Sequence, residues 1–253
     1  MKGSPMTGSL VVLGTGPGKA DLMTPATRAA LDRATDLVGY GPYLDRIPVS
    51  HPGQCRHASD NRVELDRARQ ALLLAAAGRQ VAVVSGGDPG VFAMAAAVFE
   101  AVEAGDPAWR QLDITVEPGV TAMLAAAAEG GAPLGGDFCA ISLSDNLKSW
   151  ATIERRLTAA AEGDFVIALY NPASKARPHQ LGQAFDLLRK LKDAATVVLF
   201  VRAAGTAEAR VVSTVLGEAD AAVADMRTLV IVGASTTRQV GRWVYTPRRE
   251  RST

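Results

Sequence analysis

The chain has 253 residues, 48% of them hydrophobic, so it can bury the core of one large or two modest domains. Its 27 basic and 26 acidic residues nearly cancel, which excludes a global attraction to nucleic acid or an anionic membrane. Two distant cysteines, Cys55 and Cys139, exclude a disulfide framework, and no apolar run reaches the roughly 18 residues of a membrane span. We therefore expect a cytoplasmic protein without a cleaved leader.

Short runs of Val, Ile and Leu alternate with longer alanine-rich stretches that carry spaced charges. This pattern is typical of parallel strands buried between helices, so we expect an α/β fold. The clearest helix follows Ser59 and Asp60 and ends before Gly78, with acids in its first turn. In chain order, the first half predicts strands at 10–13, 35–39, 80–85 and 112–116 and helices at 25–33, 62–77 and 92–104.

The alternation restarts after residue 119. Two further segments, RVVSTVL and RWVYTP, are expected to be strands with tighter connections, which allow antiparallel pairing. We place a domain boundary near Glu117, which predicts an N-terminal α/β domain at 8–117, a C-terminal α/β domain at 118–247 and a flexible tail at 248–253. The second half predicts strands at 138–143, 165–170, 196–201 and 229–233 and helices at 153–161, 180–191 and 218–225.

The first strand ends in a glycine-rich turn, VVLGTGPGKAD. It is similar to a dinucleotide fingerprint, but Lys19 stands where the third glycine belongs, and no acid ends the second strand. Pro17 also lacks the amide that a phosphate could use. Two interpretations stay open: a tight turn, or a close backbone approach to a ligand that is not a phosphate, with Pro17 as a wall.

The third predicted strand ends in SGGDPGVF. Gly86 and Gly87 can adopt positive φ and expose backbone amides and carbonyls. Asp88 stands before Pro89, where a helix N-cap belongs, so it either caps the next helix or contacts a cationic or hydrogen-bond-donating ligand.

A third junction, EPGVTAM, ends the next predicted strand. The small side chains of Thr121 and Ala122 would let a flat group lie against the backbone. A helix that is capped here and packs through its alanines explains the same residues equally well.

Five motifs follow one another along the chain: GTGPGKADLMT, SGGDPGVF, EPGVTA, ALYNPASKARP and VGASTTR. Together they resemble the tetrapyrrole methylases, over nearly the whole chain. The resemblance implies two α/β domains with S-adenosylmethionine in the cleft between them, S-adenosylhomocysteine as product and a homodimer. The NPASKARP block is most similar to members that methylate precorrin-3B at C17 and contract its ring in cobalamin biosynthesis.

The resemblance also implies roles for single residues. Pro17 would be a wall of the cofactor pocket, and the remaining cofactor contacts fall on the loops after the strands. In the family the first loop usually runs GPGD, whereas here Lys19 and Ala20 precede Asp21, so no role is transferred to Asp21. The implied cofactor residues are Pro17, Gly86, Gly87, Asp88, Val91, Thr121, Ala122, Asn171, Ala204 and Ser235.

A sulfonium methyl is already an activated electrophile, so its transfer depends mainly on positioning. This agrees with a sequence that has three histidines and no HxxxH or GxSxG motif, and we expect no metal. Ring contraction, in contrast, requires a proton to leave a hydroxyl group, and therefore a general base. Asp145 follows a predicted strand and is the candidate base; the other interpretation is a solvated loop acid.

The acetate and propionate groups of a precorrin require cations at the site. Lys148, Lys175 and Arg177 lie on loops that follow predicted strands, and arginine can bind a carboxylate through two hydrogen bonds. Each of them could also be ordinary surface charge.

Three alternatives remain. The substrate could be cobalt-factor III, the cobalt-loaded intermediate of the oxygen-independent route. The chain could instead be a nucleotide-binding oxidoreductase built on GTGPG, or a non-catalytic module that binds S-adenosylmethionine or a tetrapyrrole.

Overall fold

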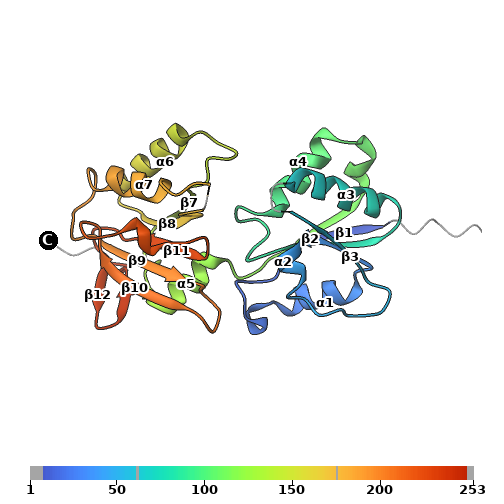
Figure 1. Cartoon of the computed structure of the whole chain (residues 1–253), viewed down its shortest axis with the longest axis horizontal. Helices are drawn as coiled ribbons and strands as arrows, with labels where there is room; N and C mark the ends of the chain where they lie inside the picture. Colours follow the sequence, from blue (N-terminus) through green and yellow to red (C-terminus); the bar gives the residue numbers. More distant parts are fainter. Residues whose placement is uncertain (1–7, 61–62, 175, 250–253) are drawn as a thin grey trace, which may run out of the picture. The chain divides into compact units, whose positions relative to one another are not determined.

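The computed structural model describes residues 8–60, 63–174 and 176–249. Contacts within the chain divide it into two units, Met1–Thr121 and Ala122–Thr253, each with its own sheet and core (Figure 1). This division lies shortly after Glu117, where the sequence places the domain boundary.

The first unit contains a five-stranded sheet in the order β3-β2-β4-β1-β5. All neighbouring strands are parallel, so their carboxyl ends share one edge of the sheet. The edge strand β3 is not expected from the sequence, because CRHAS contains no run of branched apolar residues. The strands are β1 (Ser9–Gly14), β2 (Asp36–Tyr40), β3 (Cys55–Ser59), β4 (Gln80–Ser85) and β5 (Asp113–Glu117).

Helices cover both faces of this sheet (Figure 1). On one face, α3 (Glu64–Ala76) and α4 (Met94–Ala104) pack against the strands through buried residues such as Leu72 and Val98. On the other face, α1 (Pro25–Arg33) and the short α2 (Gly41–Leu44) pack through Leu31 and Leu44. Two 3-10 helices, Ala20–Leu22 and Pro107–Gln111, complete the unit.

The second unit contains a mixed sheet in the order β10-β9-β11-β8-β7. Strands β7 and β8 are parallel, and β10 is antiparallel to β9, as expected for RVVSTVL. Strand β11 is antiparallel to both β8 and β9, which differs from the expected parallel pattern. The strands are β7 (Phe138–Ser142), β8 (Val166–Tyr170), β9 (Val197–Arg202), β10 (Arg210–Val215) and β11 (Thr228–Val232).

The prediction of a helix at 218–225 is wrong. Only a single 3-10 turn, Ala221–Val223, forms there, and Asp220 accepts a hydrogen bond from the Ala222 amide at its start. The segment DAAVADM is too short between its polar ends to bury a helical face, so it connects β10 to β11 as a loop.

The core of the second unit lies on both faces of its sheet. Helices α6 (Trp150–Glu162) and α7 (Gln180–Leu188) pack on one face with Phe200 of β9. Helix α5 (Ala122–Gly130) packs on the other, where a Cβ at Gly130 would stand 2.3 Å from Leu199. A small sheet of β6 (Gly131–Ala132), β12 (Arg238–Val240) and β13 (Trp243–Tyr245) continues from α5, and β13 falls in RWVYTP as expected.

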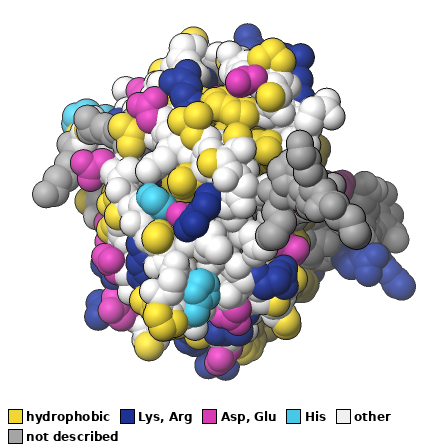
Figure 2. Space-filling view, turned by 90° about the vertical axis from the view of Figure 1, so that its right-hand side faces the viewer, with side chains coloured by type: hydrophobic (Ala, Val, Ile, Leu, Met, Phe, Trp, Pro, Cys, Tyr) yellow, Lys and Arg dark blue, Asp and Glu magenta, His cyan; other side chains and the backbone are white. Residues whose placement is uncertain are grey.

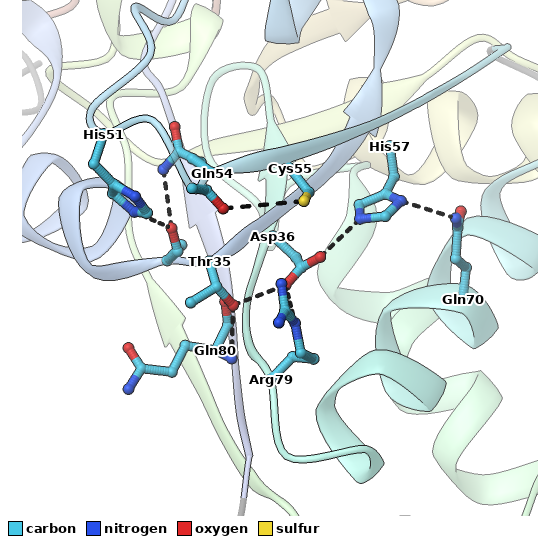
Figure 3. Close-up of polar contacts among 11 residues, drawn as sticks. Thr35, Asp36, His51, Gln54, Cys55, His57, Gln70, Arg79 and Gln80 are labelled. Atoms are coloured by element: carbon cyan, nitrogen blue, oxygen red, sulfur yellow. Dashed lines mark hydrogen bonds and ion pairs between the residues drawn. The ribbon is translucent and has the colours of Figure 1, made fainter.

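A buried acid, Asp36, holds together the amino-terminal edge of the first sheet (Figure 3). Its Oδ1 lies 2.8 Å from His57 Nε2, and its Oδ2 accepts bonds from Arg79 Nε and Thr35 Oγ1, both at 2.7 Å. Burial by itself raises the pKa of Asp36, but the bonds from Arg79 and His57 outweigh it and hold the pKa below its ordinary value. The side chain is 3% exposed, so these bonds replace its lost hydration.

The surface carries no dominant charge on the face drawn in Figure 2, where basic and acidic side chains are interspersed. This agrees with a formal net charge of +1. Within the described residues, no helix is both long and apolar enough to cross a bilayer, and no three His, Cys, Asp or Glu side chains are grouped as metal ligands would be.

We predict that Asp36→Asn lowers the free energy of unfolding by about 1–3 kcal/mol, because it removes a charged acceptor from Arg79 and His57. Urea unfolding at pH 7 measures this. Because the folded pKa of Asp36 lies below 3.8, the difference from the wild type should persist down to about that pH and disappear as the pH falls through the folded value.

Asp66→Asn is the matched control, because its ion pair with Arg69 joins side chains that are 72% and 53% exposed. We expect it to change stability by less than about 0.5 kcal/mol. Equal effects of the two substitutions would contradict the importance of the Asp36 cluster.

Candidate functional site

Three loops meet at the carboxyl edge of the first sheet. Gly16, after β1, and Gly87, after β4, form an isolated bridge in which each residue binds the other: Gly16 N donates to Gly87 O at 3.1 Å, and Gly87 N donates to Gly16 O at 2.9 Å. Both residues have positive φ, +75° and +64°, which only glycine adopts without strain. The two loops are therefore locked together through their backbones.

The glycines of these loops are required for packing against one another. A Cβ at Gly14 would stand 2.4 Å from Gly87 O, and one at Gly119, after β5, would stand 2.2 Å from the same oxygen. The amide and carbonyl of Gly87 are engaged by Gly16, so they are not exposed in the way the sequence led us to expect. Gly87 therefore joins the loops instead of offering free backbone groups, and Gly86 does not adopt the positive φ that the sequence allows it.

Asp88 ties the same loops together through its side chain. Its Oδ1 accepts from Gly90 N at 2.8 Å, and its Oδ2 accepts from Gly119 N at 3.0 Å. The interpretation of Asp88 as a helix cap is wrong, because α4 begins only at Met94. An ionised carboxylate has about four lone-pair positions, so a half-buried Asp88 retains capacity to accept further bonds.

The other predicted residues of this unit lie on the same three loops. Pro17 and Val91 are half-buried, and Thr121 is 6% exposed. Phe92 has a left-handed backbone, φ 52°, and is 51% exposed, which is unusual for a bulky side chain. Tyr43 is a neighbour that the sequence did not reveal, because the short α2 was not predicted: a Cβ at Gly86 would stand 2.8 Å from its ring.

In the second unit, a similar edge is formed by the carboxyl ends of β7, β8 and β9. Asn171, directly after β8, has a left-handed backbone, φ 52°, and its Nδ2 donates to Ser142 Oγ at 2.9 Å. The hydroxyl of Tyr170 accepts from Met123 N at 3.0 Å and so holds the first turn of α5, next to Ala122. The bond to Ser142 orients the Asn171 side chain, and the bond to Tyr170 joins β8 to α5.

Ala204 and Ser235 lie at opposite ends of the strands of the second sheet. Ala204, 7% exposed, follows β9 and is therefore on the same edge as Asn171. Ser235 follows β11, which runs the other way, and its amide and hydroxyl both bind Asp164 immediately before β8. The structure thus separates Ser235 from Asn171. Because β11 is antiparallel, its first residue, Thr228, pairs with Arg202 at the carboxyl end of β9 and lies on the same edge as Ala204.

The proposed base and cations lie on loops after β7 and β8. Asp145 Oδ2 accepts from Gln180 Nε2 at 3.2 Å, which joins the two loops. Burial, with a smaller effect of Arg156, lowers the pKa of Lys148. Arg177 closes a tight turn with Ser174, and its Nη1 is buried without a hydrogen-bond partner among the described residues. Lys175 lies outside the described residues.

Comparison with known proteins gives consistent results. Residues 9–220 match the model of the Tetrapyrrole (Corrin/Porphyrin) Methylases. The chain is 60% identical to a precorrin-3B C(17)-methyltransferase from Sinorhizobium sp, over 96% of this chain and 97% of that protein. It is 42% identical to a probable cobalt-factor III C(17)-methyltransferase from Salmonella typhimurium, over 94% of this chain and 98% of that protein.

A solved structure has the same fold over almost the full length. It is the crystal structure of the methyltransferase CobJ, with a TM-score of 0.92 and 55% sequence identity, covering 95% of this chain and 100% of that one. The family match covers the loops after β1, β4, β5 and β8, which carry four of the five motifs, whereas the fifth, VGASTTR, lies beyond residue 220. The chain therefore belongs to the tetrapyrrole (corrin/porphyrin) methylase family.

Proposed function

We propose that this chain methylates precorrin-3B at C17, with ring contraction to precorrin-4, in cobalamin biosynthesis. The observation that supports this most directly is 60% identity to a protein of that name across 96% of the chain. The proposal includes a homodimer, as the family resemblance implies, and a location in the cytoplasm, as expected from the two distant cysteines. S-adenosylmethionine is the methyl donor, and when bound it supplies an activated methyl group on a cationic sulfonium.

The residues of the first unit fit this donor. S-adenosylmethionine carries two cationic centres and ribose hydroxyl donors, which match the remaining acceptor capacity of the Asp88 carboxylate. Pro17 and Val91 supply apolar walls on adjacent loops, and Gly86 keeps the loop after β4 free of a side chain beside Tyr43. In this proposal Thr121 and Gly87 also contact the cofactor. The family resemblance assigns cofactor contacts to Ala122, Asn171 and Ala204 of the second unit as well.

Residues of the second unit would bind and orient the substrate. Arg177, Lys148 and Lys175 offer cations to its carboxylates. The assignment is supported by Arg177 Nη1, which is buried and has no partner among residues 8–60, 63–174 and 176–249. Asp145 would accept the hydroxyl proton during ring contraction. Because the sulfonium methyl is already activated, most of the rate enhancement is expected from holding the two reactants in line.

The closest alternative is methylation of the cobalt-containing substrate, since a relative at 42% identity is named for cobalt-factor III. The higher identity to the relative named for precorrin-3B favours the metal-free substrate.

We predict that the purified enzyme transfers a labelled methyl group from S-adenosylmethionine to precorrin-3B faster than to cobalt-factor III. Mass spectrometry would count the added methyl groups, and absorbance spectra would follow contraction of the macrocycle. If methyl transfer occurs only to cobalt-factor III, that compound is the substrate instead of precorrin-3B. If neither compound is methylated, the proposed function is wrong.

We predict that Gly119→Ala strongly weakens binding of S-adenosylhomocysteine, because the new methyl group would collide with Gly87 O and push apart the loops that form the edge. Isothermal titration calorimetry measures the affinity. Gly41→Ala is the matched control: a Cβ there meets nothing within 4 Å, so binding should not change. If both variants bind like the wild type, the loop edge is not part of the cofactor site.

We predict that Asp88→Asn weakens S-adenosylhomocysteine binding by about tenfold or more, because a charged acceptor is lost while the shape is retained. Calorimetry and thermal unfolding should be measured on the same preparation. A lower melting temperature with unchanged affinity would show that Asp88 serves only to join the loops.

A further inference from the structure

Gln180 is the first residue of α7, and its side chain reaches the loop after β7. Its Nε2 donates to Asp145 Oδ2 at 3.2 Å, although the two residues are 35 positions apart in the chain. No function has been attached to Gln180 so far, and the sequence motifs do not single it out.

The chemistry of Asp145 determines how the Gln180 amide is oriented. An ionised carboxylate only accepts hydrogen bonds, so the NH₂ group of the amide must face it. The amide oxygen, Oε1, then faces away. This oxygen is buried and has no hydrogen-bond partner within the described part of the chain.

A second buried atom, in the loop that leads into α7, also has no hydrogen-bond partner among the residues that the structure describes. Nη1 of Arg177, three positions before Gln180, is a donor, whereas Oε1 of Gln180 is an acceptor. Native proteins pair nearly all buried polar atoms, and each exception requires an explanation. A ligand that brings the missing partners would explain both atoms, one of which belongs to the side chain that binds the proposed base.

We propose that Gln180 is a positioning residue, which holds the Asp145 carboxylate in place and whose amide oxygen receives a hydrogen bond from the bound substrate. This inference rests on the proposed function, in which Asp145 accepts a hydroxyl proton. Because a base must lie within hydrogen-bond reach of the proton it removes, an acid on a loop needs a fixed neighbour. Gln180 provides it from the start of a helix packed on the core through Leu181 and Phe185.

The test uses two substitutions that both remove the donor to Asp145 but differ in shape and charge. Gln180→Met removes the amide at similar length, and Gln180→Glu keeps its shape but cannot donate to Asp145 when ionised. Gln183→Met is the control, because Gln183 is exposed on the same helix. The rate of ring-contracted product, the KM for precorrin-3B and the affinity for S-adenosylhomocysteine are measured for each variant, and each is repeated with Asp145→Asn.

We expect both Gln180 substitutions to lower kcat by about tenfold or more, while cofactor affinity and the Gln183→Met variant remain unchanged. In the Asp145→Asn background, Gln180→Met should have less than about a twofold further effect, because the residues act as a unit. A purely structural role of Gln180 would not produce this coupling.

Three results would overturn the inference. If wild-type kcat is retained in Gln180→Met, or if the effects of Gln180→Met and Asp145→Asn simply multiply, Gln180 does not act through Asp145. Loss of cofactor affinity in both Gln180 variants would assign it a structural role instead. These failures are distinct from failure of the proposed function, in which the wild-type enzyme itself would not methylate precorrin-3B.

Discussion

The reciprocal pair of hydrogen bonds between Gly16 and Gly87 is the constraint on which the carboxyl edge of the first sheet depends. It brings the loops after β1 and β4 so close that Gly14 and Gly119 have no room for a Cβ. Asp88 then binds the amide of Gly119 and adds the loop after β5. Three separate chain segments thereby become one rigid edge with few bulky side chains, and a ligand that binds there meets a preformed surface.

The second unit uses side chains for the same purpose. Asn171 binds Ser142, and Gln180 binds Asp145, so the loops after β7 and β8 are joined at two points. The left-handed backbone of Asn171 costs conformational energy that the surrounding bonds must offset, and such strain is common at functional sites. Rigid elements thus hold polar groups in place, which is what a reaction limited by positioning requires.

The charge distribution fits the binding of an acidic small molecule better than attraction to a polyanionic partner. The net charge is +1, and arginines such as Arg79 and Arg202 are already paired with acids of the protein itself, Asp36 and Asp225. Arg177 is different, because one of its guanidinium nitrogens is buried and finds no partner in the described part of the chain. A carboxylate-rich macrocycle would be recognised by a few such cations rather than by a long-range field.

The sequence by itself determined the α/β class, the motif order that identifies the family, and elements with strong local signals. Helix α1, for example, begins at Pro25 as predicted, because Thr24 caps it by accepting a bond from the Thr27 amide. The positions of the glycine-rich turns were also readable, since turn residues and buried apolar runs are local properties.

Only the tertiary structure decided the direction of β11, the separation of Ser235 from Asn171, and the role of Asp88 as a link between loops. Each depends on partners distant in the chain: β11 pairs with β8 and β9, and Asp88 binds an amide 31 positions away. The bond from Gln180 to Asp145 is of the same kind. Local patterns carry no information about such pairings, because their energy arises only when the chain has folded and the groups meet.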